Sequence, residues 1–392
     1  MEEVTIIGSG RTGRGMIGEL FDTDGRYHLN FADIDRQLVN LLRKKGKYSV
    51  HLRDLIGGED KIREIDDFSV YDIHQDRIEY IDKLANSRFV ITSLFPDAFD
   101  SAINDIVESI KLRYKLHKEN LVNIILSANY VGLMEYFVPR IKKRLTDKEL
   151  EYLDNYIAIL GSNANRKVTY LKDKNDLTLD GDNKYVLKVN RGFKLPNDYK
   201  LPSFIVEVDD IERVMIEKIW SENLQHIGFA FLGNYKGYNV INEAVNDPWV
   251  VKKIDAAWEE ARSAMKKVYD IPIPNAKQRK TVLDKFASPF FKDKLHRIGR
   301  AEKRKLKKND RLLGPAYLCL NNGLPADNIL KLVAYGFCYN DPFDRDSQEV
   351  LSFVKQNGIK EAVKKYCGLN LTLKNDRVVL DKVVNEYNKL RK

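Results

Sequence analysis

Short apolar runs alternate with longer amphipathic stretches through the first half of the chain. The apolar runs predict buried strands over 4–7, 28–34, 89–94 and 123–128, and the stretches that follow predict helices over 11–22, 35–45 and about 97–117. Strands and helices in alternation predict a parallel sheet that helices cover on both faces.

The second half of the chain has a different pattern. Residues 170–203 are rich in Asp, Asn, Lys and Gly, with one short strand predicted at 185–189. Beyond residue 209 the apolar residues recur at three- and four-residue spacing, which is typical of amphipathic helices. We therefore predict an α/β domain over 1–190 and a mostly α-helical domain over 191–392.

The composition narrows the class of protein. Of the 392 residues 43% are hydrophobic, which is too many for a disordered chain. No run approaches the roughly 18 apolar residues of a membrane-spanning helix, and the acidic opening MEEVTIIGSG is unlike a signal peptide. The three cysteines have no CxxC spacing, so we expect neither a disulfide framework nor a zinc site. The expectation is a soluble cytoplasmic protein that contacts no membrane.

Most of the positive charge lies in one segment. The 66 basic and 57 acidic residues give a formal net charge of +9. Residues 292–311, KDKLHRIGRAEKRKLKKNDR, include ten Lys or Arg and three Asp or Glu. A nucleic-acid surface usually spreads its charge and interleaves aromatic residues, and this segment has no aromatic residue. It is either a solvated helix face or a local site for a small anionic substrate, and we expect no nucleic-acid partner.

A glycine motif follows the first predicted strand. VTIIGSGRTGRG places Gly8, Gly10 and Gly13 in the pattern GxGxxG, between a strand and a helix. The first glycine forms the tight turn, the second lets the backbone approach a pyrophosphate, and the third lets helix and strand pack closely. The phosphate then lies at the helix N-terminus, where N–H groups and the helix dipole favour an anion. The motif predicts that the first domain is a Rossmann-type dinucleotide-binding domain.

The second predicted strand supplies a candidate ribose ligand. FADID places Asp33 twenty residues after Gly13, where a carboxylate accepts hydrogen bonds from the adenosine ribose hydroxyls. A carboxylate at this position repels a 2′-phosphate, so NAD is favoured over NADP as the cofactor. The alternative is an ordinary N-cap of the helix over 35–45.

Three polar residues lie on one predicted helix. The run EKIWSENLQHIG contains Lys218, Asn223 and His226. In an α-helix the second and third lie at about 140° and 80° from the first, within one broad face. Hydride transfer at a carbinol needs a base for the hydroxyl proton and donors for the developing oxyanion. A lysine whose pKa is lowered by burial and an asparagine amide can fill these roles, although by spacing alone solvated polar residues are the stronger interpretation.

Several longer segments resemble a known family. The opening IIGSGRTGRGMIGELF, the strand FADIDRQLV and the K-x4-N-x2-H pattern are similar to the polyol-specific long-chain dehydrogenases. The run KFASPFFKDKLHRIGRAEKRKLKKNDRLLGP is similar to the family's RFxNPxLxDxxxRVGRxPxRKL segment. Within the family the sequence resembles the mannitol-1-phosphate 5-dehydrogenase branch, over nearly the whole chain.

The resemblance implies roles for individual residues. Lys218 would be the catalytic general acid or base, and Asn223 and Asn129 would be the two halves of an oxyanion hole. His226 would hold the substrate or the lysine. No metal is implied, because the lysine transfers the proton.

The basic segment is interpreted in the same way. Arg297 and Lys305 match two basic substrate contacts of the family. If the segment is one helix, Arg297, Arg300 and Arg304 fall on one face at three- and four-residue spacing. Guanidinium groups bind phosphate bidentately, so these four residues are predicted to bind a substrate that carries phosphate.

Two positions depart from the family. NIILSANYV, which contains Asn129, is similar to the family's NIIxCENM, and the acidic residue of that segment is Ala128 here. The aspartate of the family's SxxDR motif is Asn165, in SNANR. Two carboxylates near the expected pocket are therefore absent, which leaves a more positive field for an anionic substrate.

The predicted function is an NAD-dependent, metal-independent interconversion of a sugar-alcohol phosphate and a ketose or aldose phosphate, of the mannitol 1-phosphate/fructose 6-phosphate type. One alternative is a related dehydrogenase that acts on an unphosphorylated polyol or a sugar acid. Another is a non-catalytic NAD-binding homologue. We expect a small anionic substrate as the partner and either a monomer or a homodimer.

Overall fold

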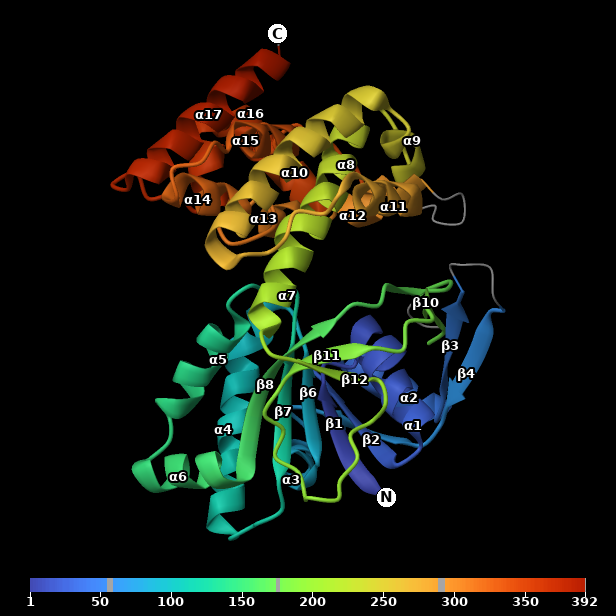
Figure 1. The fold of residues 1–392 in the computed structure, drawn as a ribbon. Coiled ribbons are helices and arrows are strands. Elements are labelled where there is room, and N and C mark those ends of the chain that lie inside the picture. The colour runs from blue at the N-terminus through green and yellow to red at the C-terminus, as the bar shows by residue number, and fades with distance from the viewer. Residues whose placement is uncertain (55–58, 174–176, 288–292, 392) are drawn as a thin grey trace. The chain divides into compact units, whose positions relative to one another are not determined.

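The computed structural model describes residues 1–54, 59–173, 177–287 and 293–391 (Figure 1). These residues form two compact units, Met1–Glu212 and Arg213–Lys392. The first unit is an α/β unit of the Rossmann type and the second is mostly helical, so the predicted fold class is confirmed. The predicted boundary near residue 190 coincides with the end of strand β11, and the first unit continues through β12 to Glu212.

An eight-stranded sheet forms the centre of the first unit, in the order β12-β11-β8-β7-β6-β1-β2-β5. The six strands from β8 to β5 are parallel, whereas β11 and β12 run in the opposite direction. The strands are β1 (Glu2–Ile7), β2 (Tyr27–Asp33), β5 (Phe68–Asp72), β6 (Phe89–Ser93), β7 (Val122–Ser127), β8 (Ile157–Ala164), β11 (Leu187–Asn190) and β12 (Ile205–Val208).

Alternation of side chains along the strands gives the sheet two apolar faces. Val4 and Ile6 of β1 belong to one core, and Ile7 belongs to the other. The first core is covered by η1 (Gly13–Gly18), α1 (Glu19–Asp24) and α2 (Arg36–Lys45). The second is covered by α3 (Arg77–Asn86), α4 (Phe99–Lys115), α5 (Leu133–Lys142) and α6 (Asp147–Tyr156), with the short 3-10 helix η2 (Pro96–Ala98) before α4. Nearly every residue of the central strands β6 and β7 is buried, as expected for a sheet covered on both faces.

A second, four-stranded sheet packs against η1 and was not predicted. Its order is β4-β3-β10-β9, with β3 (Tyr48–Arg53), β4 (Lys61–Ile65), β9 (Val168–Tyr170) and β10 (Leu179–Asp182). A Cβ on Gly15 of η1 would lie 2.5 Å from Cγ1 of Val168, so the glycine lets helix and sheet approach closely.

Helices form the second unit. They are α7 (Ile211–Glu217, whose first residues belong to the first unit), η3 (Lys218–Glu222), α8 (Asn223–Tyr235), α9 (Ile241–Val245), α10 (Pro248–Tyr269), α11 (Ala276–Ala287), α12 (Leu295–Gly299), α13 (Glu302–Lys305), α14 (Leu313–Asn321), α15 (Asp327–Gly336), α16 (Arg345–Cys367) and α17 (Lys374–Leu390). The long helix α10 begins with a cap, because Asp247 accepts from the N–H groups of Trp249 and Val250. It ends where Asp270 adopts a left-handed conformation.

Two absences apply to the described part of the chain. No helix there is long and apolar enough to cross a membrane. Nor do three or more His, Cys, Asp or Glu side chains gather there in a group that could hold a metal ion.

Candidate active site

The turn after β1 has the geometry that a dinucleotide-binding glycine motif needs. Gly8 has a φ of +97°, a conformation that L side chains rarely adopt. A Cβ on Gly8 would lie 2.3 Å from the carbonyl oxygen of Ser93, and a Cβ on Gly13 would lie 2.0 Å from that of Gly8. A Cβ on Gly10 would meet nothing within 4 Å. Internal packing therefore requires Gly8 and Gly13, whereas Gly10 presents open backbone where a pyrophosphate can approach.

Asp33, the last residue of β2, lies beside this turn. Its Oδ2 accepts from the backbone N–H of Ser9 at 2.7 Å, and its Oδ1 accepts from that of Asp35 at 2.9 Å. The N-cap of α2 is Asp35, whose side chain accepts from the N–H groups of Gln37 and Leu38. The alternative interpretation of Asp33 as an ordinary N-cap is therefore wrong.

Arg14 supports the turn from the protein side. It is wholly buried, and its Nε donates to the carbonyl oxygen of Ser9 at 2.7 Å. Its guanidinium lies 5.4 Å from the centre of the Tyr48 ring, and burial lowers its pKa. Sequence reasoning missed this residue. The signal for it is an arginine directly after the third glycine, in a stretch of otherwise small and apolar residues.

The other predicted residues of the first unit lie at the same edge of the sheet. Strand β1 lies between β6 and β2, which makes it the place where the strand order reverses and where open α/β sheets bind ligands. Asn129 follows β7 at this edge and is exposed. Ala128 precedes it, and Asn165 follows β8. The two departures from the family are thus both at carboxyl ends of parallel strands.

Lys218 and Asn223 lie one turn apart on an unusual helix. The helix η3 is a π-helix, and the N–H of Asn223 donates to the carbonyl of Lys218. In a π-helix residues five apart are neighbours on successive turns, as residues four apart are in an α-helix. The α-helical angle of about 140° between them is therefore wrong, and the two side chains leave nearly the same side of the helix. Lys218 is 8% exposed.

Neighbouring helices hold the π-helix in place. The indole Nε1 of Trp258 on α10 donates to Oγ of Ser221 at 2.8 Å. On α14, a Cβ at Gly314 would lie 2.4 Å from Nε1 of Trp220, so this glycine lets the tryptophan lie against the α14 backbone. Both aromatic rings are nearly buried, and the irregular turn is therefore a fixed part of the core.

A buried carboxylate links His226 to Arg297. Nε2 of His226 lies 3.5 Å from Oδ2 of Asp293, and the imidazole stacks on Phe286 with ring centres 5.4 Å apart. Oδ1 of Asp293 accepts from Nε of Arg297 at 2.5 Å. Asp293 thus positions two of the predicted site residues, although sequence reasoning gave it no role. Its four-residue spacing to Arg297 is the signal that the sequence offers.

The basic segment is not one helix. Helix α12 ends at Gly299, Arg300 is extended, and Ala301 has a left-handed φ of 59° before α13 begins. The expectation that Arg297, Arg300 and Arg304 share one helix face is therefore wrong, because the chain turns between them. Arg300 and Arg304 are both partly exposed.

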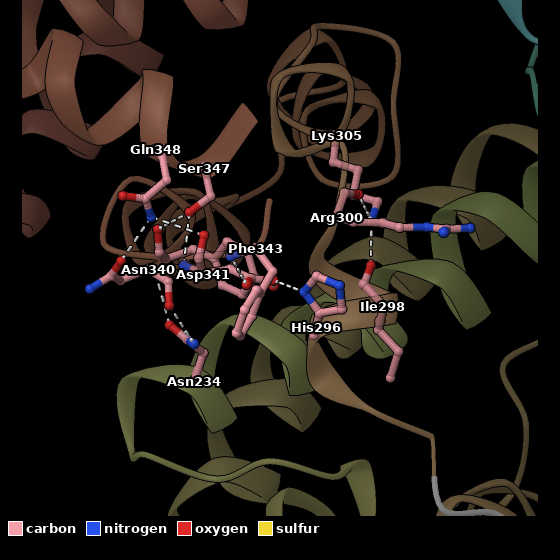
Figure 2. A network of polar contacts seen from close by, with 11 residues as sticks. Asn234, His296, Ile298, Arg300, Lys305, Asn340, Asp341, Phe343, Ser347 and Gln348 are labelled. Atoms are coloured by element: carbon pink, nitrogen blue, oxygen red, sulfur yellow. Dashed lines mark hydrogen bonds and ion pairs between the residues drawn. The ribbon is translucent and has the colours of Figure 1, made fainter. Parts of the chain in front are cut away.

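Some charges of this segment are buried, so the interpretation of the segment as a solvated helix face is wrong as well. Lys305 is 4% exposed, and its Nζ donates to the carbonyls of Ile298 and Arg300 (Figure 2). Burial and the nearby charges of Arg311 and Arg304 hold the pKa of Lys305 well below its usual value. Lys305 is thus an internal brace across the turn between α12 and α13.

A polar network anchors the start of α12 (Figure 2). Nδ1 of His296 pairs with Oδ2 of Asp341, which also accepts from the hydroxyl of Tyr339 at 3.0 Å. The N–H of Asp341 donates to Oγ of Ser347 at 3.0 Å. A Cβ on Gly299 would lie 2.1 Å from the Tyr339 hydroxyl oxygen, so this helix packs directly on the network. These contacts make His296 a structural residue.

Models of one family match nearly the whole chain. The mannitol dehydrogenase Rossmann domain matches residues 2–188, and the mannitol dehydrogenase C-terminal domain matches residues 210–390. The mannitol-1-phosphate 5-dehydrogenase of Streptococcus pneumoniae (strain 70585) is 25% identical over 390 residues, which cover 99% of this chain and 100% of that protein.

Solved structures share the fold. Pseudomonas fluorescens mannitol 2-dehydrogenase, in a ternary complex with NAD and D-mannitol, aligns over 100% of this chain and 92% of its own, with a TM-score of 0.76 and 14% identity. D-sorbitol dehydrogenase in substrate-free form aligns over 99% and 93%, with a TM-score of 0.67 and 13% identity. The two domain matches, with the full-length relatives and this shared fold, show that the chain belongs to the mannitol dehydrogenase family.

Proposed function

We propose that the protein is an NAD-dependent dehydrogenase that interconverts a sugar-alcohol phosphate and a ketose or aldose phosphate, of the mannitol 1-phosphate/fructose 6-phosphate type. Family membership supports the general activity, that of an NAD-dependent polyol dehydrogenase. The phosphate is supported by relatives named mannitol-1-phosphate 5-dehydrogenase that cover the whole chain.

The observation that carries this proposal is the π-helix that aligns a buried lysine with an asparagine. Lys218 is the general acid or base for the hydroxyl proton, since burial is the environment in which a lysine gives up its charge most easily. Asn223, on the same side of the helix, donates its amide to the developing oxyanion, and Asn129 is the second donor. His226, held by Asp293, orients the lysine or the substrate.

The first unit holds the cofactor in this proposal. Gly8, Gly10 and Gly13 form the turn for the pyrophosphate, and the Asp33 carboxylate accepts from the ribose hydroxyls. NAD, when bound, takes up or supplies the hydride. The open space beside Gly10 and the carboxylate beside Ser9 fit such a group.

The substrate's phosphate is assigned to the basic segment. Arg297, Arg300, Arg304 and Lys305 are the proposed contacts. Arg300 and Arg304 are partly exposed and belong to a turn that Lys305 holds, so the segment offers guanidinium groups on a rigid support.

A second candidate, a dehydrogenase of an unphosphorylated polyol or sugar acid, is favoured by one observation. The charge of Arg297 is paired with Asp293, and Lys305 donates to two backbone carbonyls. Arg304 lies 3.9 Å from a carboxylate oxygen of Asp310 as well. At least three of the four proposed phosphate contacts thus have partners within the protein, which reduces the positive charge available to a substrate phosphate.

One kinetic experiment tests the proposal and separates the candidates. NADH oxidation is followed with fructose 6-phosphate and with free fructose, for the unaltered enzyme and for Lys218→Ala. We expect a higher kcat/KM for the phosphate, with an advantage that shrinks as salt rises, and a loss of kcat of about 10²-fold or more in the variant. A free sugar used as well as its phosphate would favour the second candidate. A Lys218→Ala variant with undiminished turnover would overturn the lysine mechanism.

A further inference from the structure

A pocket on the second unit lies between α10 and α15. It has a volume of about 310 Å³ and is lined by Trp249, Lys252, Lys253, Ala256, Asn328, Lys331, Leu332 and Tyr335. The four lining residues of each helix follow the spacing i, i+3, i+4, i+7, so each helix contributes one continuous stripe. Such a stripe between two packed helices is normally apolar, and here it contains three lysines.

The three lysines of this α10–α15 pocket are not neutralised within the protein. Among the residues that the structure describes, no carboxylate lies at ion-pair distance from Lys252, Lys253 or Lys331. Burial and the charge of Lys331 lower the pKa of Lys253, against an opposing effect of Glu386. Glu386 itself pairs with Lys389 at 3.2 Å. Like charges are thus gathered where an anion would relieve their repulsion.

Aromatic rings form the wall beside these charges. Nζ of Lys253 lies 4.7 Å from the centre of the Trp249 ring and 5.8 Å from that of Tyr335. Trp249 is 39% exposed, so part of its ring is available to a ligand. Asn328 fixes one lysine, since its Oδ1 accepts from Nζ of Lys331 at 3.1 Å. The backbone N–H and the side-chain amide of Asn328 donate to the carboxylate of Glu260, which also accepts from the backbone N–H of Ile329.

We infer that the α10–α15 pocket binds a small organic phosphate monoester at a site separate from the proposed active site. A phosphate monoester has a charge near −2 and three acceptor oxygens, which match three ammonium groups that bind phosphate as point charges. The exposed part of the Trp249 ring packs against the apolar part of the attached group. The volume is at the lower limit of small-ligand pockets. It suits a sugar or a single nucleoside and excludes a dinucleotide.

Binding is measured without turnover, and the pocket variant keeps every residue of the proposed active site, so the inference can fail while the proposed function stands. The full chain is titrated at low salt with fructose 6-phosphate and with adenosine 5′-monophosphate, which present the same phosphate on a sugar and on a nucleoside. Free fructose and adenosine are the unphosphorylated controls. Tryptophan fluorescence is the local signal, since Trp249 lines the pocket and the other two tryptophans, Trp220 and Trp258, are 8% and 6% exposed.

The decisive variant removes the three pocket lysines together. We expect K252A/K253A/K331A to bind the phosphate monoester at least about tenfold more weakly, and the fluorescence response to disappear in Trp249→Phe. The matched control is K355A/K360A/K374A, which removes the same charge from exposed positions of the same unit and is expected to bind normally. The glutamine versions at 252, 253 and 331 keep the side-chain stems if the alanine variant folds poorly.

Each outcome decides the matter. A fluorescence response to either phosphate that the pocket variant loses and the control variant keeps supports the site. The compound that causes the response shows whether the phosphate is that of a sugar or that of a nucleoside. Equal binding by the pocket variant and the unaltered chain would overturn the inference. So would an equal loss in the control variant, a response to free fructose or adenosine as strong as to the phosphates, or no response to either phosphate.

Discussion

Asp33 and Asp35 lie two residues apart in one short turn, and their carboxylates accept hydrogen bonds from different parts of the chain. Asp35 caps α2 through the N–H groups of Gln37 and Leu38. Asp33 accepts from the N–H of Ser9 and therefore holds the glycine turn to the end of β2. The sequence alone leaves both assignments open for Asp33, because the two positions are separated by a single residue and either suits a cap.

The pair allows a matched test of cofactor choice. Asp33→Ala should narrow the preference for NADH over NADPH, because the carboxylate that repels the 2′-phosphate is removed. Asp35→Ala should leave the preference unchanged and cost about 0.5–2 kcal/mol of stability, as loss of a helix cap does. Equilibrium binding of both cofactors and thermal unfolding of both variants give the answer. If the unaltered protein bound NADH and NADPH equally, Asp33 would not select the cofactor.

At the scale of elements, local motifs were predictable and long-range pairings were not. The expected strands at 4–7, 28–34, 89–94 and 123–128 correspond to β1, β2, β6 and β7, and the expected helices to η1–α1, α2 and α4. The four-stranded sheet escaped prediction because β3 pairs with β10, more than a hundred residues later in the chain. The alternation of buried and partly exposed residues in β3, YSVHLR, indicates a strand but does not identify its partner.

The site residues, too, were predictable where their signal is local and not where it depends on distant parts of the chain. The glycine motif and the lysine–asparagine–histidine pattern are local, and the sequence indicated both. The left-handed residue at the break is Ala301 and not a glycine, so the sequence marks the break only through Gly299 at the end of α12. The burial of Lys305 depends on helices that precede and follow it. A charge-rich segment therefore looked like a solvated helix although part of it is interior.

The glycine turn predicts opposite consequences for two similar substitutions. Gly13→Ala should destabilise the fold, since its Cβ would lie 2.0 Å from the carbonyl oxygen of Gly8. Gly10→Ala should unfold at the same temperature as the unaltered protein, since its Cβ meets nothing within 4 Å. It should nevertheless weaken NADH binding, because the methyl group occupies the approach of the pyrophosphate. Thermal unfolding and NADH titration of both variants test this, and a Gly10→Ala variant with normal affinity would contradict it.

Helix α13 predicts an unusual dependence of stability on pH. Burial, with Asp344 and Asp346 nearby, holds the pKa of Glu302 well above its usual value. An acid whose pKa is raised by folding contributes its full stability below its unfolded pKa of about 4.3 and loses it as the pH rises toward the folded pKa. Glu302→Gln should therefore raise the stability of the protein at neutral pH.

Denaturant unfolding between pH 4 and pH 8 measures this effect. Glu243→Gln is the control with the opposite sign, because N–H donation from Asn239 and Val240 lowers the pKa of Glu243. That variant should lose stability at neutral pH, and its loss should shrink only as the pH falls below the usual range of a glutamate, through the lowered folded pKa of Glu243. If Glu302→Gln were no more stable than the unaltered protein at pH 7, the carboxyl would not be held in its protonated form.

At the scale of the whole molecule, the two compact units divide between Glu212 and Arg213. The segment between the predicted boundary and this position is part of the first core. Phe204 is wholly buried there, and its ring lies 5.0 Å from that of Phe21. Strand β12 pairs in parallel with β11 at the edge of the sheet.

This division predicts how fragments behave. Residues 1–212 alone should unfold cooperatively and bind NADH. A fragment of residues 1–190 should be less stable, because it lacks β12 and Phe204, whose burial is worth about 3–5 kcal/mol by comparison with large-to-small substitutions. Circular dichroism melting and NADH fluorescence compare the two fragments. Equal melting temperatures would place the end of the folding unit nearer residue 190.

The π-helix at Lys218 has a consequence for sequence change over time. A π turn is equivalent to an α-helix with one inserted residue, so deletion of a single residue within it restores a regular helix. The wider turn takes up the extra residue, so α7 and α8 keep nearly the phase of one continuous helix, and after the deletion the lysine and the asparagine lie four residues apart on nearly the same side. Because α8 is buried along most of its length, its packing tolerates a change of length only where that phase is kept. A deletion inside the π turn is thus compatible with the core of the second unit, whereas a deletion within α8 itself would turn every later residue of the helix by about 100°.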